Sequence, residues 1–330
     1  MKADASGTFE GNVLVCGGAG YIGSHTARHL RESGLSTLVL DNLSTGYREL
    51  AGEPLLEVDL GDREALGRVF DEHRPAAVVH FAAKCYVGES VTDPAKYYRE
   101  NVTYTWNLLE AMRAADCSRI VFSSTCATYG DPVEMPMTEG HAQLPISPYG
   151  RTKLHMEHMM QDYARAYGLR YAALRYFNAA GASQDATLGE LHDPETHLIP
   201  LVLQVAAGQR EEILVFGDDY PTPDGTCIRD YIHVEDLADA HRRALLKLDE
   251  ESEIACNLGT GTGFSVLEVI ETARRVTGHP IPHRVVERRP GDPPELVSGG
   301  TRARDLLGWQ PQRAGLEDIV RDAWNFMQSR

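Results

Sequence analysis

The sequence has few cysteines, no long apolar run and fewer basic than acidic residues. Its six cysteines are scattered without a Cys-x-x-Cys pair, so we expect no disulfide framework and no metal site. Most of them fall in apolar runs typical of strands, which favours buried free thiols. No stretch is apolar enough to span a bilayer, and residues 1–11 read as a polar, flexible tail without a signal-peptide core. We therefore expect a cytoplasmic protein.

The excess of negative charge also limits the partners. With 32 basic and 48 acidic residues, the net charge is -16, which argues against nucleic-acid or anionic-membrane binding. An anionic small substrate would need locally placed arginines. With 330 residues, of which 42% are hydrophobic, the chain can bury a large core divided between two lobes.

Short apolar runs alternate with helical patterns through the first half of the chain. These runs lack the polar alternation of a half-exposed strand, so the pattern predicts parallel strands covered by helices on both faces. The predicted fold is an α/β, doubly wound parallel sheet of the Rossmann type, with ligands at the carboxyl ends of its strands. The predicted strands are 12–16, 37–40, 55–58, 77–81, 119–122 and 171–176.

The pattern loosens after Phe177, where a loop rich in small residues begins. We predict a dinucleotide-binding domain at 12–177, to which 226–260 returns. Segments 178–225 and 261–330 then form a smaller, mixed α/β substrate domain.

A glycine motif joins the first strand to the first helix. Gly17, Gly20 and Gly23 permit a tight turn and let backbone N–H groups and the helix N-terminus approach a pyrophosphate. Asp41 ends the next strand, where a carboxylate can accept bonds from ribose hydroxyls and favours NAD over NADP. The alternative is a glycine turn followed by a surface aspartate. The order of strand, loop, helix, strand and acid favours dinucleotide binding.

Tyr149 and Lys153 are the strongest catalytic signal. Being four residues apart, they lie on the same face of a helix, with Pro148 in its first turn. A lysine beside a phenol stabilises phenolate and lowers the pKa, giving a base usable near neutrality. Alone, such a pair is more typical of a helix surface. Thr125, at the end of a strand, adds a hydroxyl that could face the same substrate oxygen, although a strand can also simply end in capping hydroxyls.

These features closely resemble the extended short-chain dehydrogenase/reductase family. The resemblance includes Ser-Pro-Tyr-Gly-Arg-Thr-Lys at 147–153 and covers nearly everything from Asn12 to the C-terminal helix. The other segments that carry it are 17–25, 40–43, 87–90, 174–178, 216–226, 229–234 and 288–292.

The resemblance implies an isomerase with tightly held NAD that epimerises UDP-hexoses at C4 through a transient 4-keto sugar. Tyr149 would be the base, assisted by Lys153, while Thr125 would hold the 4-oxygen. Arg229 and Arg289 would neutralise the pyrophosphate of the substrate. Enzymes of this type are usually homodimers, here through the helices around 94–115 and 148–167.

The same resemblance implies two sets of binding residues. The cofactor set is Gly17, Gly20, Tyr21, Ile22, Gly23, Asp41, Asn42, Asp59, Leu60, Phe81, Ala82, Ala83, Lys84, Asn101, Ser123, Tyr149, Lys153 and Phe177. The UDP-sugar set is Lys84, Thr125, Tyr149, Asn178, His197, Leu198, Leu214, Phe216, Arg229, Arg289, Asp292 and Leu296.

Three positions depart from the family pattern. Thr125 stands where serine is frequent, and it keeps the hydroxyl. His197 stands where relatives often have asparagine, so it either contacts substrate or simply starts a helix. In family members restricted to unsubstituted sugars, the position of Leu296 resembles a bulky tyrosine. The smaller leucine leaves room for an N-acetyl group, which predicts some activity on UDP-N-acetylglucosamine and UDP-N-acetylgalactosamine. The alternative is that Leu296 only packs.

Two other functions compete with epimerisation. A 4,6-dehydratase or decarboxylase of the same family is close, but dehydratases place an acidic pair directly after the threonine, where this chain has Cys126 and Ala127. Without those carboxylates, water elimination lacks its acid and base. A non-catalytic NAD-binding regulator would need the glycine loop but neither Tyr149 nor Lys153.

Overall fold

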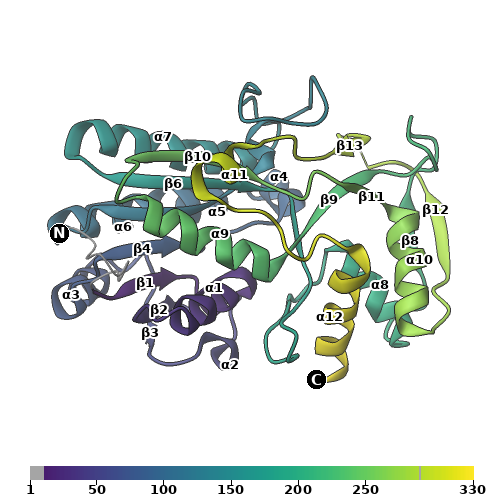
Figure 1. Ribbon diagram of the computed structural model, residues 1–330, viewed down its shortest axis with the longest axis horizontal. Helices are drawn as coiled ribbons and strands as arrows, with labels where there is room; N and C mark the ends of the chain where they lie inside the picture. The colour runs from purple at the N-terminus through teal and green to yellow at the C-terminus, as the bar shows by residue number, and fades with distance from the viewer. Residues whose placement is uncertain (1–10, 290) are drawn as a thin grey trace.

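A seven-stranded sheet forms the centre of the larger lobe in the computed structural model, which describes residues 11–289 and 291–330 (Figure 1). The expected tail at 1–11 thus lies almost wholly outside the described residues. Each strand runs parallel to its neighbours, which confirms the predicted sheet. In spatial order the strands are β10 (Glu253–Leu258), β6 (Arg170–Tyr176), β5 (Arg119–Thr125), β4 (Ala77–His80), β1 (Val13–Cys16), β2 (Thr37–Asp41) and β3 (Leu55–Glu57).

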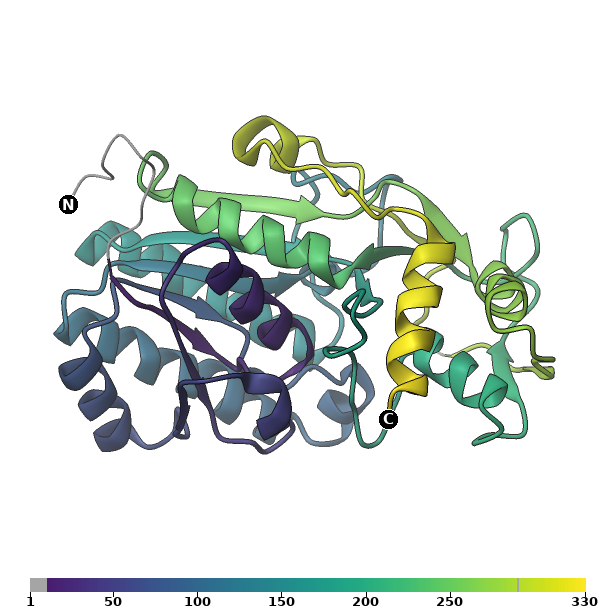
Figure 2. The same cartoon turned by 60° about the horizontal axis from the view of Figure 1, so that its bottom comes forward.

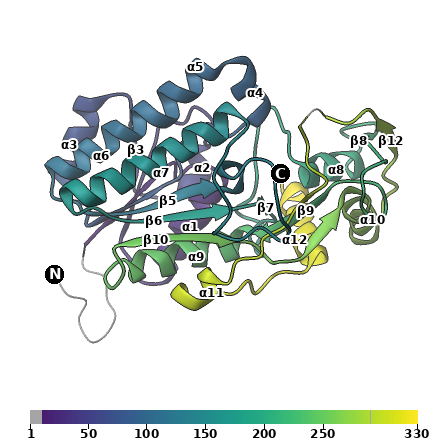
Figure 3. The ribbon, with the colours of Figure 1, turned by 90° about the horizontal axis from the view of Figure 1, so that it is seen from above.

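Helices cover both faces of this sheet, as Figure 3 shows from above. In β1, Val13 and Val15 belong to the core under one layer, whereas Leu14 and Cys16 belong to the core under the other. Because both faces are dry, the strand carries no polar alternation. The first layer contains α1 (Tyr21–Glu32), α2 (Arg48–Ala51), α9 (Val234–Lys247) and α11 (Arg302–Leu307). The second contains α3 (Arg63–His73), α4 (Val87–Thr92), α5 (Pro94–Tyr97), the π-helix Tyr98–Thr103, α6 (Tyr104–Ala114) and α7 (Pro148–Tyr167).

The glycine loop between β1 and α1 lies where the strand order reverses. A Cβ atom on Gly17, whose φ is +79°, would lie 2.5 Å from the backbone nitrogen of Ala82. One on Gly23 would lie 2.1 Å from the carbonyl oxygen of Gly17. These two glycines therefore let the loop, the end of β4 and the start of α1 approach one another closely. Helix α1 begins at Tyr21, with neither a side-chain cap nor an acidic residue in its first turn.

The smaller lobe is built around two small sheets. One joins β9 (Ile228–His233) to β11 (Gly263–Ser265), β13 (Glu295–Leu296) and β7 (Asn178–Ala180); the other pairs β8 (Ile213–Phe216) with β12 (His283–Val286). Helices α8 (Leu198–Ala206), α10 (Val266–Thr277) and α12 (Leu316–Gln328) share one core with these strands. Figure 2 shows α12, in yellow, standing beside this lobe.

The chain passes between the lobes more than once. Strand β9 belongs to the small sheet, whereas α9 packs beside α1 and β10 completes the edge of the large sheet. The predicted return of 226–260 therefore divides: its first strand, β9, stays in the smaller lobe, and only α9 and β10 join the larger one.

Cys16, Cys117, Cys227 and Cys256 are buried free thiols, but Cys85 is exposed, because it lies in the loop between β4 and α4. None of the described helices has the length and apolarity needed to cross a membrane.

Candidate active site

The three predicted catalytic residues come from one strand end and one helix start. Thr125 is the last residue of β5, and Tyr149 and Lys153 occupy the first turns of α7. Ser147 caps this helix by accepting a hydrogen bond from the backbone N–H of Gly150, at 3.1 Å. The Thr125 hydroxyl lies close enough to the Tyr149 phenol to lower its pKa. The phenol and the hydroxyl therefore meet at the carboxyl edge of the sheet.

Lys153 is anchored to the strand rather than to the phenol. Its ammonium donates a 2.8 Å hydrogen bond to the carbonyl of Ser123, and its side chain is buried over the ring of Phe122. Burial lowers the pKa of Lys153 to about 8. The carbonyl contact fixes α7 against β5 beside the reacting groups.

The expected low pKa of Tyr149 is not found. Burial raises this pKa well above its usual value, Cys85 adds to the rise, and the nearby Thr125 hydroxyl only partly opposes it. The Lys153 ammonium, which was expected to lower this pKa, donates to the Ser123 carbonyl instead. Further positive charge near the ring is needed for Tyr149 to act as a base near neutrality.

Asp41 holds the glycine loop. One carboxylate oxygen accepts a 3.0 Å hydrogen bond from the backbone of Ala19, and the other accepts one of 2.8 Å from Leu43. Burial raises the pKa of Asp41, while these N–H donors and Lys84 act in the opposite direction. The carboxylate predicted to face a ribose thus also joins the end of β2 to the phosphate loop.

Asn101, in the π-helix, connects the end of β4 to α7. Its side-chain oxygen accepts from the backbone N–H of Lys84 at 2.7 Å, and its amide donates to the hydroxyl of Thr152 at 3.0 Å. A π-turn rotates the residues on either side of it and is frequent at functional sites. Lys84 extends its ammonium to within 3.3 Å of the hydroxyl of Ser44.

The remaining predicted cofactor residues lie at the same edge of the sheet. Each lies in the first turn of α1, in the last part of a strand or just after a strand, namely Tyr21 and Ile22 in α1, Asn42 after β2, Asp59 and Leu60 after β3, Phe81, Ala82 and Ala83 after β4, Ser123 in β5 and Phe177 after β6.

The smaller lobe contributes two arginines. Arg229, in β9, pairs with Asp292 at 2.5 Å, and Arg289 lies 3.9 Å above the ring of Phe216. Burial raises the pKa of Cys126 to about 12, and the charge of Arg229 opposes this rise. Arg229 is therefore an electrostatic neighbour of the end of β5.

Leu296 lies beside Arg229 in the β13–β9 pair. It packs, half-buried, on a small cluster that contains Phe177 and Cys126. This position fits the packing alternative and places Leu296 on the same cluster as Cys126, the residue after Thr125. Of the other predicted substrate residues, Leu214 and Phe216 share the less buried face of β8, Leu198 packs on the core of the smaller lobe, and Asn178 donates to the backbone of Asp230 at 3.2 Å.

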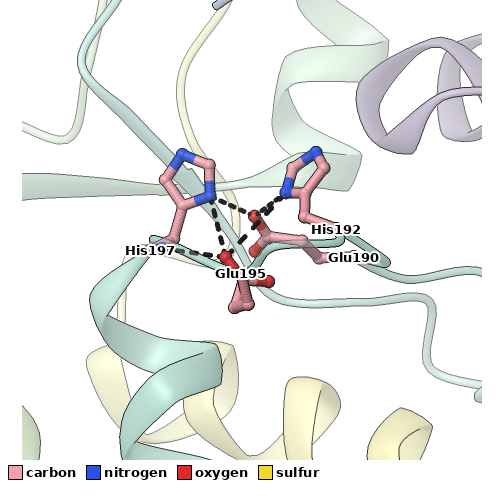
Figure 4. A group of neighbouring side chains, drawn as sticks. All are labelled: Glu190, His192, Glu195 and His197. Atoms are coloured by element: carbon pink, nitrogen blue, oxygen red, sulfur yellow. Dashed lines mark hydrogen bonds and ion pairs between the residues drawn. The ribbon is translucent and has the colours of Figure 1, made fainter. Parts of the chain in front are cut away.

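His197 precedes the first residue of α8 but makes no capping bond. Its Nδ1 atom lies 2.6 Å from Glu190 and 3.3 Å from Glu195 (Figure 4). The helix-start alternative therefore describes its position, and its substrate contact stays a prediction.

Comparison with known proteins gives a consistent result. Residues 13–259 match the model of the NAD dependent epimerase/dehydratase family. The chain is 52% identical to the UDP-glucose 4-epimerase of Streptomyces lividans over 322 residues, covering 97% of each. It resembles the crystal structure of UDP-glucose 4-epimerase from Brucella ovis in complex with NAD, with a TM-score of 0.93, 53% identity and coverage of 95% of this chain and 97% of that one.

A third similarity is to the UDP-glucose 4-epimerase from Bifidobacterium longum in complex with NAD+ and UDP. Here the TM-score is 0.92 and the identity 37%, over 97% of this chain and 98% of that one. The chain belongs to the NAD-dependent epimerase/dehydratase family. The family resemblance inferred from its motifs is thus confirmed.

Two residues that position α7, Glu157 and Arg175, were not predicted from the sequence as part of the site. Glu157, in α7, accepts hydrogen bonds from Arg175 of β6 at 2.6 and 3.0 Å and another from Ser124, next to Thr125. Both charged side chains are almost fully buried. The one signal available in the sequence was an arginine within the apolar run 171–176, which calls for a buried partner.

We predict that Glu157→Ala lowers the free energy of unfolding by about 3–5 kcal/mol, because it leaves the Arg175 guanidinium buried and unpaired. Urea denaturation followed by circular dichroism would measure this. The double change Glu157→Leu with Arg175→Met should recover most of the loss, since no charge is then left buried. A loss below about 1 kcal/mol for the single variant would contradict the assignment.

Proposed function

We propose that this protein catalyses the NAD-dependent, reversible epimerisation of UDP-hexoses at C4, interconverting UDP-galactose and UDP-glucose. The observation that carries the proposal is the meeting of Tyr149, Thr125 and buried Lys153 at the sheet edge that also carries the glycine loop. The names of the similar proteins support the same activity.

The loop fits a dinucleotide. Gly17 and Gly23 leave no room for side chains, and the uncapped start of α1 presents backbone N–H groups without competing acidic residues. Asp41 and Lys84 would hold the ribose and the nicotinamide side of NAD. When bound, NAD supplies a reversible hydride acceptor and a positive charge near the phenol. That charge is what Tyr149 lacks in the protein alone.

The remaining steps, proton transfer and positioning of the sugar, fall to residues of the protein. Tyr149 takes the proton of the sugar 4-hydroxyl and returns it, while Thr125 holds the 4-oxygen. Lys153, fixed on the Ser123 carbonyl, keeps the helix and its charge in place. Inversion requires the transient 4-keto sugar to present its other face. The protein must therefore grip the UDP part firmly and the sugar loosely.

The arginines of the smaller lobe suit that grip. Arg229 and Arg289 would bind the diphosphate, for which the guanidinium fork is well shaped, while Phe216 would face the uracil and Asp292 the ribose. In the structure each arginine already has a partner, Asp292 or the Phe216 ring, that orients it. These four residues can thus receive an acidic substrate despite the net charge of -16.

Water elimination is less well supported. Thr125 is followed by Cys126 and Ala127, and the hydroxyl of Thr125 accepts the backbone N–H of Ala127 at 3.1 Å. No carboxylate stands at either position to act as acid or base.

We expect the purified protein to convert UDP-galactose to UDP-glucose without added NAD, as followed by chromatography of the nucleotide sugars. Tyr149→Phe should lower kcat by about 100-fold to 10,000-fold, because the proton acceptor is removed. Tyr163→Phe, a change on the same helix far from the sheet edge, serves as the control. Unchanged turnover in Tyr149→Phe, or a 4-keto-6-deoxy product, would overturn the proposal.

We also propose that Leu296 leaves space for an N-acetyl group. The wild type should therefore turn over UDP-N-acetylglucosamine. In the Leu296→Tyr variant, the ratio of kcat/KM for UDP-N-acetylglucosamine to kcat/KM for UDP-glucose should fall by at least about tenfold. Leu296→Met, which conserves volume, should leave that ratio nearly unchanged. Absence of any turnover of the acetylated sugar by the wild type would show that Leu296 only packs.

We further propose a homodimer through α5, the π-helix that follows it, α6 and α7. Tyr98 and Trp106 are each 40% exposed there, and Tyr167 is 59% exposed. Light scattering after size exclusion should give twice the chain mass, and Trp106→Glu should shift it to the monomer. Leu144→Glu, at an exposed apolar residue outside these helices, should not. A monomeric wild type at micromolar concentration would refute the dimer.

A further inference from the structure

The loop that leads into α8 gathers two histidines and two glutamates. Glu190 and His192 form one Glu-x-His pair, and Glu195 and His197 form a second with the same spacing (Figure 4). One ligand atom from each of the four lies within 4.8 Å of the others. We propose that these residues bind one divalent transition-metal ion, with zinc as the best match. The expectation of a metal-free protein would then be wrong at this loop.

The separations already match the size of a coordination shell. Oε1 of Glu190 lies 2.9 Å from Nδ1 of His192 and 2.6 Å from Nδ1 of His197. Oε1 of Glu195 lies 4.0 and 3.3 Å from the same two nitrogens. Ligands about 2.0–2.1 Å from zinc in a tetrahedron are about 3.3 Å apart. Two of these distances differ from that value by about 0.7 Å and one by about 0.4 Å. The four atoms, which lie within 4.8 Å of one another, can therefore surround an ion after shifts of about 1 Å.

The charge of the cluster also requires compensation. The side chains of Glu190 and Glu195 are each only 7% exposed, and the ion pairs found for them in residues 11–289 and 291–330 involve histidines, not lysine or arginine. Two buried carboxylates are costly unless they are paired or coordinate a metal. Either protonated histidines or one divalent ion with neutral imidazoles can balance them.

The geometry at His192 suits a metal ligand. Its Nδ1 is buried, and although it lies 2.9 Å from Glu190, it makes no hydrogen bond of acceptable geometry. A protonated imidazole would gain most from a well-directed N–H bond, whereas a neutral nitrogen with its lone pair turned into the cluster is what a metal ligand needs.

The surroundings hold the ligands in place. Oε1 of Glu195 accepts the backbone N–H groups of Thr196 and His197, at 2.7 and 2.8 Å. The His192 ring packs edge-on against Tyr86, with ring centres 5.9 Å apart. Such outer contacts fix the orientation of ligands and strengthen metal binding.

The donor set selects the class of ion. Two imidazoles with two carboxylates suit zinc and its neighbours in the first transition row, whereas magnesium and calcium prefer oxygen donors alone. The ion would tie the loop after β7 to the start of α8. Its binding does not depend on the proposed epimerase reaction.

The test is equilibrium dialysis of the full-length, tag-free protein with Zn²⁺, with the bound metal measured by elemental analysis. We expect one ion per chain in the wild type. His192→Ala combined with Glu195→Gln should weaken binding by more than about 100-fold, since loss of even an outer partner costs about 10–100-fold. His155→Ala, which removes an exposed histidine elsewhere, should retain the ion.

Co²⁺ supplies a second readout that needs no variant. It should give the intense visible absorption of a four-coordinate site, and an equivalent of Zn²⁺ should abolish it. Absence of bound Zn²⁺ in the wild type would overturn the proposal. Equal binding by the wild type and the double variant, or a Co²⁺ spectrum of the hydrated ion, would show adventitious surface binding and would also overturn it.

Discussion

The buried ion pair between Glu157 and Arg175 is the constraint on which the active-site geometry depends. It ties α7 to β6 and, through Ser124, to β5, one helical turn beyond Lys153. The Lys153 bond to the Ser123 carbonyl reinforces the same contact from the other side. A tyrosine on a helix and a threonine on a strand can stay side by side only if the helix and the strand do not slide past each other. Charge buried away from the chemistry thus determines where the chemistry happens.

The larger lobe brings all of its site residues to one edge because its strands are parallel. Carboxyl ends of β1 to β6 meet there, so the glycine loop, Asp41 and Thr125 become neighbours although the chain separates them widely. The smaller lobe adds a different chemistry. Arg229, on β9, approaches the end of β5, as its effect on Cys126 indicates, and Arg289 lies on the loop after β12. The residues proposed to act on the cofactor side and those proposed to bind the substrate diphosphate therefore come from separate cores.

The fold and the placement of Tyr149 and Lys153 on one helix were predictable because their signals are local. Strand, glycine loop, helix and acid come one after another along the chain, and Tyr149 and Lys153 share one helical face. The pairing of Glu157 with Arg175 and the π-turn that carries Asn101 depend on contacts between distant segments, so no local pattern revealed them. The direction of the Tyr149 pKa shift was predicted wrongly for two reasons. Spacing along the sequence shows that Lys153 is near Tyr149, but not that its ammonium donates to the Ser123 carbonyl. Spacing also does not show how strongly burial raises the pKa of the phenol. The two Glu-x-His pairs were visible, yet only folding showed that their ligand atoms converge.

The placement of β10 at the edge of the large sheet has a consequence for synthesis on the ribosome. The sheet gains its seventh strand only after the chain has passed through β7, β8 and β9 of the other lobe. Neither lobe can therefore finish folding before most of the polypeptide has left the exit tunnel. For the same reason, neither lobe is a single contiguous stretch that recombination could exchange between genes as one cassette. The two lobes must therefore fold together and be inherited together.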